Sequence, residues 1–211
     1  MAKKYAMFPT TLAVEAACAV MRVNNGYVAV GIVGSDNRAS NKSLLTEFIA
    51  QPDMITTEDR EQAAGVLTYF KSLLWKNTLT GRRMSDFDNS CMNIANDDEV
   101  QENYLGQVAY MPVVFKRAQA KQTVEDRLYE CEARYLGNPG DNILATIEIL
   151  SKVYSRNYGC YFYSAITGDN LAVTFASQKG DFEINTGYKI KAKVKQQLDG
   201  FKTKINYVKI V

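Results

Sequence analysis

Lysines recur at every second position near the end of the chain, in the segment YKIKAKVKQQLDGFKTKINYVKIV. Successive side chains of a strand point to opposite faces, so this alternation predicts a strand with one basic face and one apolar face. Asp199-Gly200 predicts a hairpin turn into a second strand, which adds further lysines to the basic face. The members of this face are Lys189, Lys191, Lys193, Lys195, Lys202 and Lys204.

Lysines gathered on one side of a two-stranded ribbon can neutralise the phosphates of a nucleic acid. A two-residue turn places Lys195 opposite Lys204, and Lys193 opposite Asn206. Like charges directly opposite one another destabilise a sheet, so we expect an external polyanion to compensate for them. The alternative is that the lysines keep a sheet edge from pairing with other chains.

The aromatic residues form a second group that could do chemistry. The segment YSRNYGCYFY at 154–163 carries five aromatic side chains, and aromatic rings stack on nucleic-acid bases. If a two-residue turn within 168–170 ends this strand, Tyr161 and Tyr163 face outward and Phe162 lies in the core. A three-residue turn would exchange the two faces.

Together the basic and aromatic groups predict a binding site for single-stranded nucleic acid, with DNA favoured over RNA. Rings that stack on bases, beside cations that hold phosphates, are the combination that such sites use. Arg156, in the turn between two strands, can stack on a base or hold a phosphate. The predicted site comprises Lys152, Arg156, Tyr158, Tyr161, Tyr163, Lys189, Lys191, Lys193, Lys195, Lys202 and Lys204.

A small β-domain in the last third of the chain must position these residues. GNPGD at 137–141 concentrates turn-forming residues, and after it the hydrophobic period changes from 3.6 to 2. Five strands without an intervening helix predict a Greek-key barrel of the oligonucleotide-binding (OB) type over 141–211. The expected strands are 142–154, 158–167, 171–177, 188–198 and 201–211.

Residues 1–137 predict a mainly helical domain, so the fold class expected of the whole chain is α+β. Pro9 precedes a helix, Ser40 and Thr57 are expected N-caps, and Asn25-Gly26 predicts a turn into a short strand or buried connection, YVAVGIVG. Further helices are expected at 85–95, 98–110 and 123–136, with Pro112 breaking the run between the last two. We expect this domain to mediate self-association or to contact a replication protein.

Basic charge is concentrated in the predicted barrel. Residues 1–140 hold 15 Lys and Arg against 17 Asp and Glu, whereas residues 141–211 hold 10 against 6. This asymmetry favours the C-terminal domain as the part that meets a polyanion.

Histidine is absent from all 211 residues. Its absence excludes histidine-based catalytic triads, metal sites and proton shuttles. The sequence contains no Walker A, GxGxxG or GxSxG motif. Carboxylate chemistry on Asp86, Asp88, Asp97 and Asp98 is the remaining alternative, but DFD and NDDE are typical of turns and helix caps. We therefore expect no enzymatic activity, cofactor or metal.

The cysteines and the apolar runs indicate the setting of the protein. Cys18, Cys91, Cys131 and Cys160 are widely spaced and form no C-x-x-C pair, which is typical of reduced thiols and predicts a cytoplasmic protein. Glu15 interrupts the first apolar stretch, which favours an amphipathic helix over a signal peptide. The apolar runs are shorter than the roughly 18 residues of a membrane-spanning helix, so we expect no membrane partner.

The segment AKVKQQLDGFKTKINYVKI resembles a recurrent ending of OB-like domains in replication and DNA-processing proteins of tailed bacteriophages. The matching residues are Val194-Lys195, Gly200, Phe201, Thr203, Ile205 and Val208-Lys209, and DNLAVTFAS at 169–177 resembles the strand that often precedes this ending. Gln196 and Lys202 depart from the pattern. The resemblance covers the last third only and implies DNA replication or recombination in the cytoplasm of an infected cell. The alternative function is a viral structural or assembly protein whose barrel is a protein-interaction module.

Overall fold

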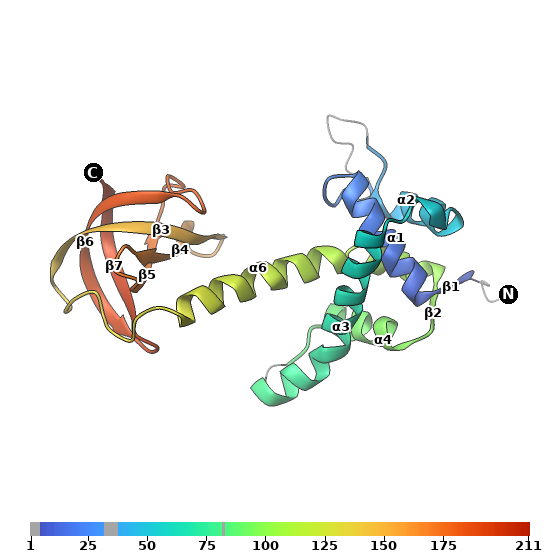
Figure 1. The fold of residues 1–211 in the computed structure, drawn as a ribbon, viewed down its shortest axis with the longest axis horizontal. Helices are drawn as coiled ribbons and strands as arrows, with labels where there is room; N and C mark the ends of the chain where they lie inside the picture. The colour runs from blue at the N-terminus through green and yellow to red at the C-terminus, as the bar shows by residue number, and fades with distance from the viewer. Residues whose placement is uncertain (1–4, 32–37, 82) are drawn as a thin grey trace. The chain divides into compact units, whose positions relative to one another are not determined.

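The computed structural model describes residues 5–31, 38–81 and 83–211 and divides the chain into two compact units, Met1–Gln119 and Ala120–Val211 (Figure 1). Helices build the first unit, and a closed five-stranded barrel builds the second. The predicted α+β fold with an OB-like barrel is confirmed.

The first unit packs around an alanine-rich helix. Its helices are α1 (Thr10–Val23), α2 (Asn41–Ala50), α3 (Thr57–Thr80), α4 (Asp86–Asn96), α5 (Leu105–Val108) and the first part of α6 (Met111–Tyr129). Two short strands, β1 (Met7–Pro9) and β2 (Glu99–Gln101), pair antiparallel. Residues 13–20 of α1 are buried, except the half-buried Glu15, because neighbouring elements cover most of its surface. Small side chains allow those elements to pack closely on α1.

A buried carboxylate joins α3 to α1. Nε and Nη2 of Arg22, in the last turn of α1, donate hydrogen bonds to Asp59 at 3.0 and 2.8 Å. The backbone amide and the hydroxyl of Thr56 both donate to the same carboxylate at 3.0 Å, within the capping box of α3. Burial by itself raises the pKa of Asp59, but the hydrogen bonds from Arg22 and Thr56 outweigh it and hold the pKa below its usual value.

Several sequence expectations for the helical unit need correction. The expected helix over 98–110 is instead β2, the 3-10 turn η2 (Glu102–Tyr104) and α5. The cap of α3 is Thr56 rather than Thr57, which is the first helical residue. No strand is present over residues 27–31, and the rest of the expected segment YVAVGIVG lies outside the described residues. The expected cap Ser40 is confirmed, since its side chain accepts a hydrogen bond from the backbone amide of Ser43 at the start of α2.

The last helix begins earlier than expected because Pro112 does not break it. Pro112 is the second residue of α6, where the missing amide hydrogen has no helical acceptor to satisfy. The helix therefore runs from Met111 to Tyr129 rather than over 123–136.

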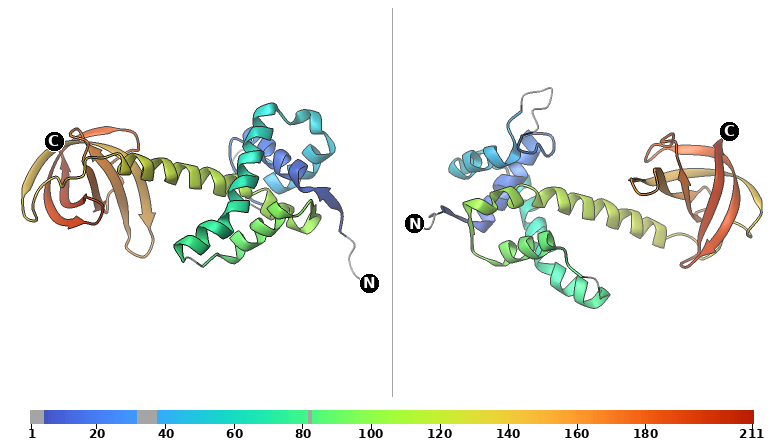
Figure 2. Two further views of the ribbon diagram at one scale, coloured as in Figure 1. Left: turned by 60° about the horizontal axis from the view of Figure 1, so that its bottom comes forward. Right: turned by 180° about the vertical axis from the view of Figure 1, so that it is seen from behind.

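The barrel consists of β3 (Asn142–Ser155), β4 (Cys160–Thr167), β5 (Ala172–Ser177), β6 (Gly187–Leu198) and β7 (Lys202–Ile210). Its closed order is β3-β4-β5-β7-β6, and Figures 1 and 2 show these strands wrapped around a common interior. The pairing of β5 with β7 is parallel, and the other pairs are antiparallel. All five expected strands are present, with ends that differ by no more than two residues.

The C-terminal end of α6 belongs to the barrel unit. Leu128 packs with Leu150 and Ala172, and Arg127 forms a bidentate ion pair with Glu148 on β3, with both hydrogen bonds 2.9 Å long. On the outer surface, Ile166 of β4 lies between Glu148 and Ala172. The helix thus covers one end of the outer surface of β3, β4 and β5. This packing places the division between the units at Gln119–Ala120 rather than at GNPGD.

Within the described part of the chain, none of the helices combines the length and the apolar character that crossing a membrane requires.

We predict that Asp59→Asn lowers the free energy of unfolding of the helical unit by about 1.5–3 kcal/mol, because charged hydrogen bonds are removed. The folded-state pKa of Asp59 lies below the unfolded-state value, about 3.9, so the ionised carboxylate stabilises the fold above that pH. This contribution disappears as the pH falls through the folded-state pKa. Urea unfolding followed by far-UV circular dichroism should show a gap between wild type and variant that is constant near neutral pH and closes on acidification.

The matched control is Asp53→Asn, since Asp53 is exposed in the 3-10 turn η1 (Pro52–Met54). This substitution should change stability by no more than about 0.5 kcal/mol. An Asp59→Asn variant as stable as the control would contradict the structural role of the carboxylate.

Candidate nucleic-acid interface

The turn between β4 and β5 decides which aromatic side chains face outward. Residues 168–170 separate Thr167 from Leu171, whose backbone groups are hydrogen-bonded, and Asn170 has the left-handed φ of 57°. The turn therefore has three residues, and Tyr163 pairs with Phe175. The expectation that Tyr161 and Tyr163 face outward is wrong, because Tyr161 shares the face of Tyr163 and packs against the barrel core.

Tyr163 is a core residue of the barrel. Its side chain is 2% exposed, and its ring stacks on Phe175 with centroids 4.8 Å apart. The ring also meets Phe182 edge-on, and the hydroxyl donates a hydrogen bond to the carbonyl of Lys179. Burial raises the pKa of Tyr163. This side chain cannot stack on a base without opening the barrel.

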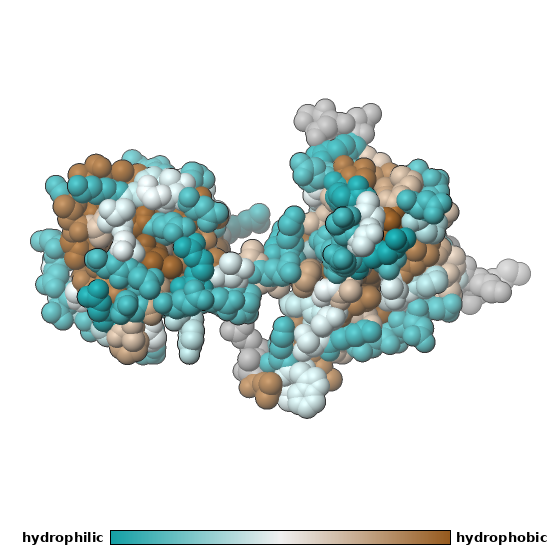
Figure 3. All heavy atoms as spheres, viewed as in Figure 1, coloured by the Kyte–Doolittle hydropathy of each residue, from teal (hydrophilic) through white to brown (hydrophobic). Residues whose placement is uncertain are grey.

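Phe162 takes the outward position instead. Its side chain is 40% exposed and meets Tyr158, in the turn between β3 and β4, with ring centroids 5.9 Å apart. Val153 is the cross-strand neighbour of Phe162 on β3 and is also exposed. Arg156 is exposed in the same turn as Tyr158. Apolar side chains interrupt the hydrophilic surface on the face of the molecule shown in Figure 3.

A row of polar side chains runs across the barrel beside Phe162. Ser164 on β4 is opposite Thr174 on β5, Thr174 is paired with Lys204 on β7, and Lys204 is opposite Gln196 on β6. Ser164, Thr174 and Lys204 are half-buried and alternate with buried neighbours, so all three face outward. We define Tyr158, Phe162, Ser164, Thr174 and Lys204 as the stacking face.

Tyr161 lies on the opposite side of the β3–β4 hairpin from Phe162. Its ring meets Tyr154, with centroids 5.0 Å apart, and packs against Gly180. Lys152 lies over the ring of Tyr161, with Nζ 5.4 Å from the centroid. That ammonium donates to Glu183 and to the carbonyl of Gly180, and the hydrogen bond to Glu183 raises the pKa of Lys152. Lys152 and Tyr161 are therefore engaged within the fold.

The β6–β7 hairpin has a different register from the expected one. Leu198 pairs with Lys202, so the turn has three residues, Asp199 to Phe201, rather than two. Lys204 is consequently opposite Gln196, and Lys195 lies at a bulge without a cross-strand partner. The pair of Lys193 with Asn206 is confirmed, and the like-charged pair is Lys191 with Lys209. Lys202 is half-buried beside the turn.

The β6 lysines form a surface separate from the stacking face. Lys189, Lys191, Lys193 and Lys195 are exposed and alternate with the buried Ile190, Ala192 and Val194, as the alternation predicted. We call these four, with Lys209 of β7, the lysine wall. Along β3, Lys189 is opposite Thr146 whereas Phe162 is opposite Val153, an offset of about 20 Å. The predicted single platform of aromatic and basic residues is therefore two adjacent surfaces.

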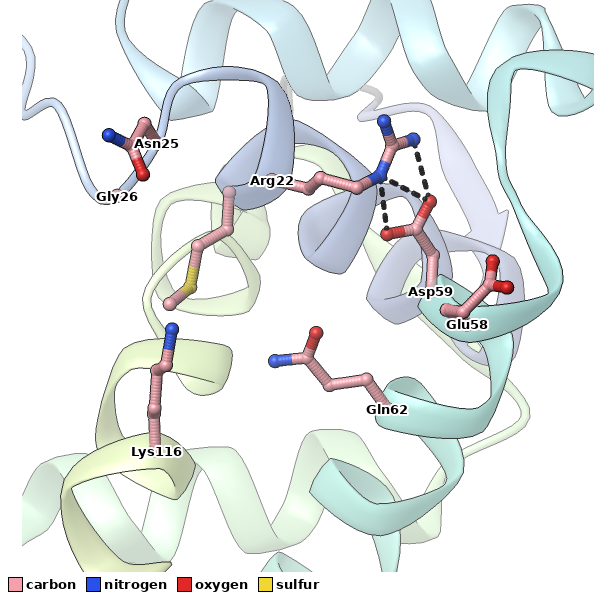
Figure 4. A pocket seen from close by; sticks show the side chains of 8 residues that line it. Arg22, Asn25, Gly26, Glu58, Asp59, Gln62 and Lys116 are labelled. Carbon is pink, nitrogen blue, oxygen red and sulfur yellow. Dashed lines mark hydrogen bonds and ion pairs between the residues drawn. The ribbon is translucent and has the colours of Figure 1, made fainter. Parts of the chain in front are cut away.

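The helical unit has a surface pocket of a different kind. It has a volume of about 360 Å³ and is lined by Met21, Arg22, Asn25, Gly26, Glu58, Asp59, Gln62 and Lys116. In Figure 4 the guanidinium of Arg22 points to Asp59, and Lys116 lies on the other side of the pocket. The Arg22 cation is thus already paired with a structural carboxylate of the fold.

The described residues also bear on metal and thiol chemistry. Among them, no group of three Cys, Asp or Glu side chains is placed to hold a metal ion. Burial raises the pKa of the Cys18 and Cys91 thiols to about 12, with a smaller contribution from nearby carboxylates. These two thiols are therefore poor nucleophiles at neutral pH.

Comparison with known proteins finds no matching family model, curated protein or solved structure. What the site can do follows from its own residues. Phe162, Ser164 and Lys209 were not predicted from the sequence as surface residues of the two faces. The signal that could have found the first two was GDN at 168–170, because asparagine favours the left-handed conformation that ends a three-residue turn.

We predict that Tyr163→Ala destabilises the barrel by about 3–5 kcal/mol, because it removes a buried ring from the core. Phe162→Ala should cost no more than about 1 kcal/mol, since much of that ring is exposed. Urea unfolding of the two variants compares adjacent residues of one strand and so serves as its own control. A larger loss of stability from Phe162→Ala would show that β4 presents its other face to solvent.

Proposed function

We propose that this chain binds single-stranded nucleic acid, DNA in preference to RNA, through the stacking face of its barrel and without catalysing a reaction. The observation that carries the proposal is the exposed pair of rings Tyr158 and Phe162 on the outer surface of an OB-like barrel. Every base offers a ring face for such stacking, which is worth about 1–3 kcal/mol per base.

The residues next to these rings favour a nucleic-acid strand, rather than an isolated base, as the ligand. Ser164 and Thr174 place hydroxyls next to Phe162, and Lys204 adds a cation one strand further. Arg156 adds a second cation on the side of Tyr158. Hydroxyls and cations flanking aromatic rings can hold the sugar-phosphate backbone of a strand whose bases stack.

The choice of DNA and of a biological setting rests on the resemblance of the C-terminal segment to phage replication and DNA-processing proteins. On that basis we place the protein in phage DNA replication or recombination, in the cytoplasm of the infected cell. The excess of basic residues over 141–211 supports a polyanionic ligand for this part of the chain.

We predict that the full chain binds a fluorescent oligo-dT of about 20 nucleotides at low salt, as measured by anisotropy. Phe162→Ala should weaken binding by about 1–3 kcal/mol and leave the salt dependence almost unchanged, because stacking releases few counterions. Lys204→Gln should instead reduce the slope of log K against log salt by about 0.7.

The matched control for Phe162 is Tyr104→Ala, which removes a ring of the same exposure, 40%, from the 3-10 turn η2 of the helical unit. It should bind as wild type does. Absence of binding by the wild-type chain at low salt would overturn the proposed function.

The alternative function, a structural or assembly protein, is favoured by one observation in the helical unit. Leu74, Trp75 and Leu79 expose apolar side chains on the last turns of α3, where Leu73 faces the core. Trp75 and Leu79 are four residues apart and so share one side of the helix. A further copy of the chain could cover this face through a different surface of its own, and repetition of that contact would build a larger symmetric assembly.

Size-exclusion chromatography with light scattering distinguishes the two functions. Large symmetric assemblies of the wild-type chain without nucleic acid, abolished in a Trp75→Gln, Leu79→Gln variant, would favour the assembly protein. A monomer at every concentration would contradict self-association through α3 and leave the stacking face as the functional surface.

A further inference from the structure

The lysine wall is a concentration of positive charge that the fold does not neutralise. Lys191 is directly opposite Lys209, and Lys193 lies between Asn142 and Asn206. Lys189 is opposite Thr146. None of these cross-strand partners carries a carboxylate, and among the described residues no ion pair involves a member of the wall.

Two carboxylates at the ends of the β3–β6 pairing are used elsewhere. Asp141 follows the GNPG turn and accepts a hydrogen bond from the backbone amide of Asn138 at 2.8 Å. Glu148, at the other end of the β3–β6 pairing, is held by Arg127. Like charges opposite one another destabilise a sheet. Their retention on one face is explained if an external anion occupies that face.

The geometry of the wall fits a linear polyanion. Lys189, Lys191 and Lys193 are successive outward residues of one strand, so their Cα atoms are about 6.6 Å apart. That spacing is close to the separation of neighbouring phosphates in an extended nucleic-acid strand. A compact anion such as free phosphate would meet only one or two of these side chains.

Lys204 connects the wall to the stacking face. It pairs with Thr174 of the stacking face on one side and with Gln196, next to Lys195, on the other. A nucleic-acid strand that leaves the exposed rings and crosses β5 and β7 therefore meets Lys204 and then the lysine wall. The path from β4 to β6 crosses three strand spacings, about 14 Å.

We propose that the lysine wall is a second tract for the same nucleic-acid strand, which holds its phosphates without stacking its bases. The inference rests on the proposed function and extends it, because it divides the ligand between two surfaces. Short oligonucleotides occupy the stacking face alone, whereas longer ones also occupy the wall. The preferred ligand is thus a single strand long enough to cover both surfaces.

The test compares oligo-dT of about 5 and about 20 nucleotides, lengths within and beyond the reach of one stacking surface. Binding of the full chain is measured by anisotropy over a range of salt. Lys191→Gln with Lys193→Gln should weaken binding to the long strand by roughly tenfold at low salt and reduce its salt slope by about 0.7 for each phosphate that is no longer neutralised. Binding to the short strand should change by less than about twofold.

The matched control removes two exposed lysines of the helical unit, Lys42→Gln with Lys71→Gln, which changes the net charge equally. It should leave both affinities unchanged, and circular dichroism checks that both double variants are folded. Unchanged binding of the long strand by the wall variant would overturn the second tract while leaving the stacking face intact. Equally weakened binding of both lengths would overturn the division into two surfaces.

The same two variants are also tested for binding to vesicles containing phosphatidylserine. If the Lys191→Gln, Lys193→Gln variant loses the vesicle binding of the wild-type chain but binds the long oligonucleotide unchanged, the proposal is overturned and the lysine wall is assigned to an anionic membrane. If the wild-type chain binds neither oligonucleotide, both the proposed function and the second tract fail.

Discussion

The register of β4 against β5 is the constraint on which the surface of the barrel depends. Tyr163 stacks on Phe175 and meets Phe182, and these three rings fill one part of the barrel interior. Once Tyr163 points inward, the alternation of the strand requires Phe162 and Ser164 to point outward. A slip by one residue would bury Phe162 and expose Tyr163, leaving a different set of rings for a ligand.

The barrel also determines how charge and stacking are distributed. Closure in the order β3-β4-β5-β7-β6 places β3 between β4 and β6 on one side, and β5 and β7 between them on the other. The exposed rings and the β6 lysines cannot therefore share one platform, although each set faces outward. Lys204 is the basic residue that lies in the row joining them. Beyond Ser164 on β4, Ile166 is opposite Glu148, and there the ion pair of Arg127 with Glu148 helps to hold the end of α6 on the barrel.

Much of the fold could be predicted from the sequence because its periodic signals are strong. The alternation of lysines with Ile190, Ala192 and Val194 specifies both the strand and its buried face, and GNPGD marks the change of period. The turns were harder to predict. One additional residue in the β4–β5 turn changes which side chains of β4 face outward, and one in the β6–β7 turn changes which residues pair across that hairpin. Asp199-Gly200 favours a two-residue turn, yet Phe201 adopts a left-handed φ of 57° and extends it to three. The sequence did not predict that the end of α6 belongs to the barrel unit, because its packing on β3 and β5 is a tertiary effect that local pattern does not contain.

An NMR titration of the isotopically labelled chain with oligo-dT tests the central claim most directly, because it locates the ligand residue by residue. The account predicts that backbone amide signals of Phe162, Ser164, Thr174 and Lys204 shift first, with those of β6 following only for long strands. Signals of the buried core of the helical unit, such as Val66 and Phe70, should remain unchanged. Shifts confined to the helical unit, or no shift at any oligonucleotide concentration, would contradict the assignment of the barrel as the nucleic-acid-binding part of the chain.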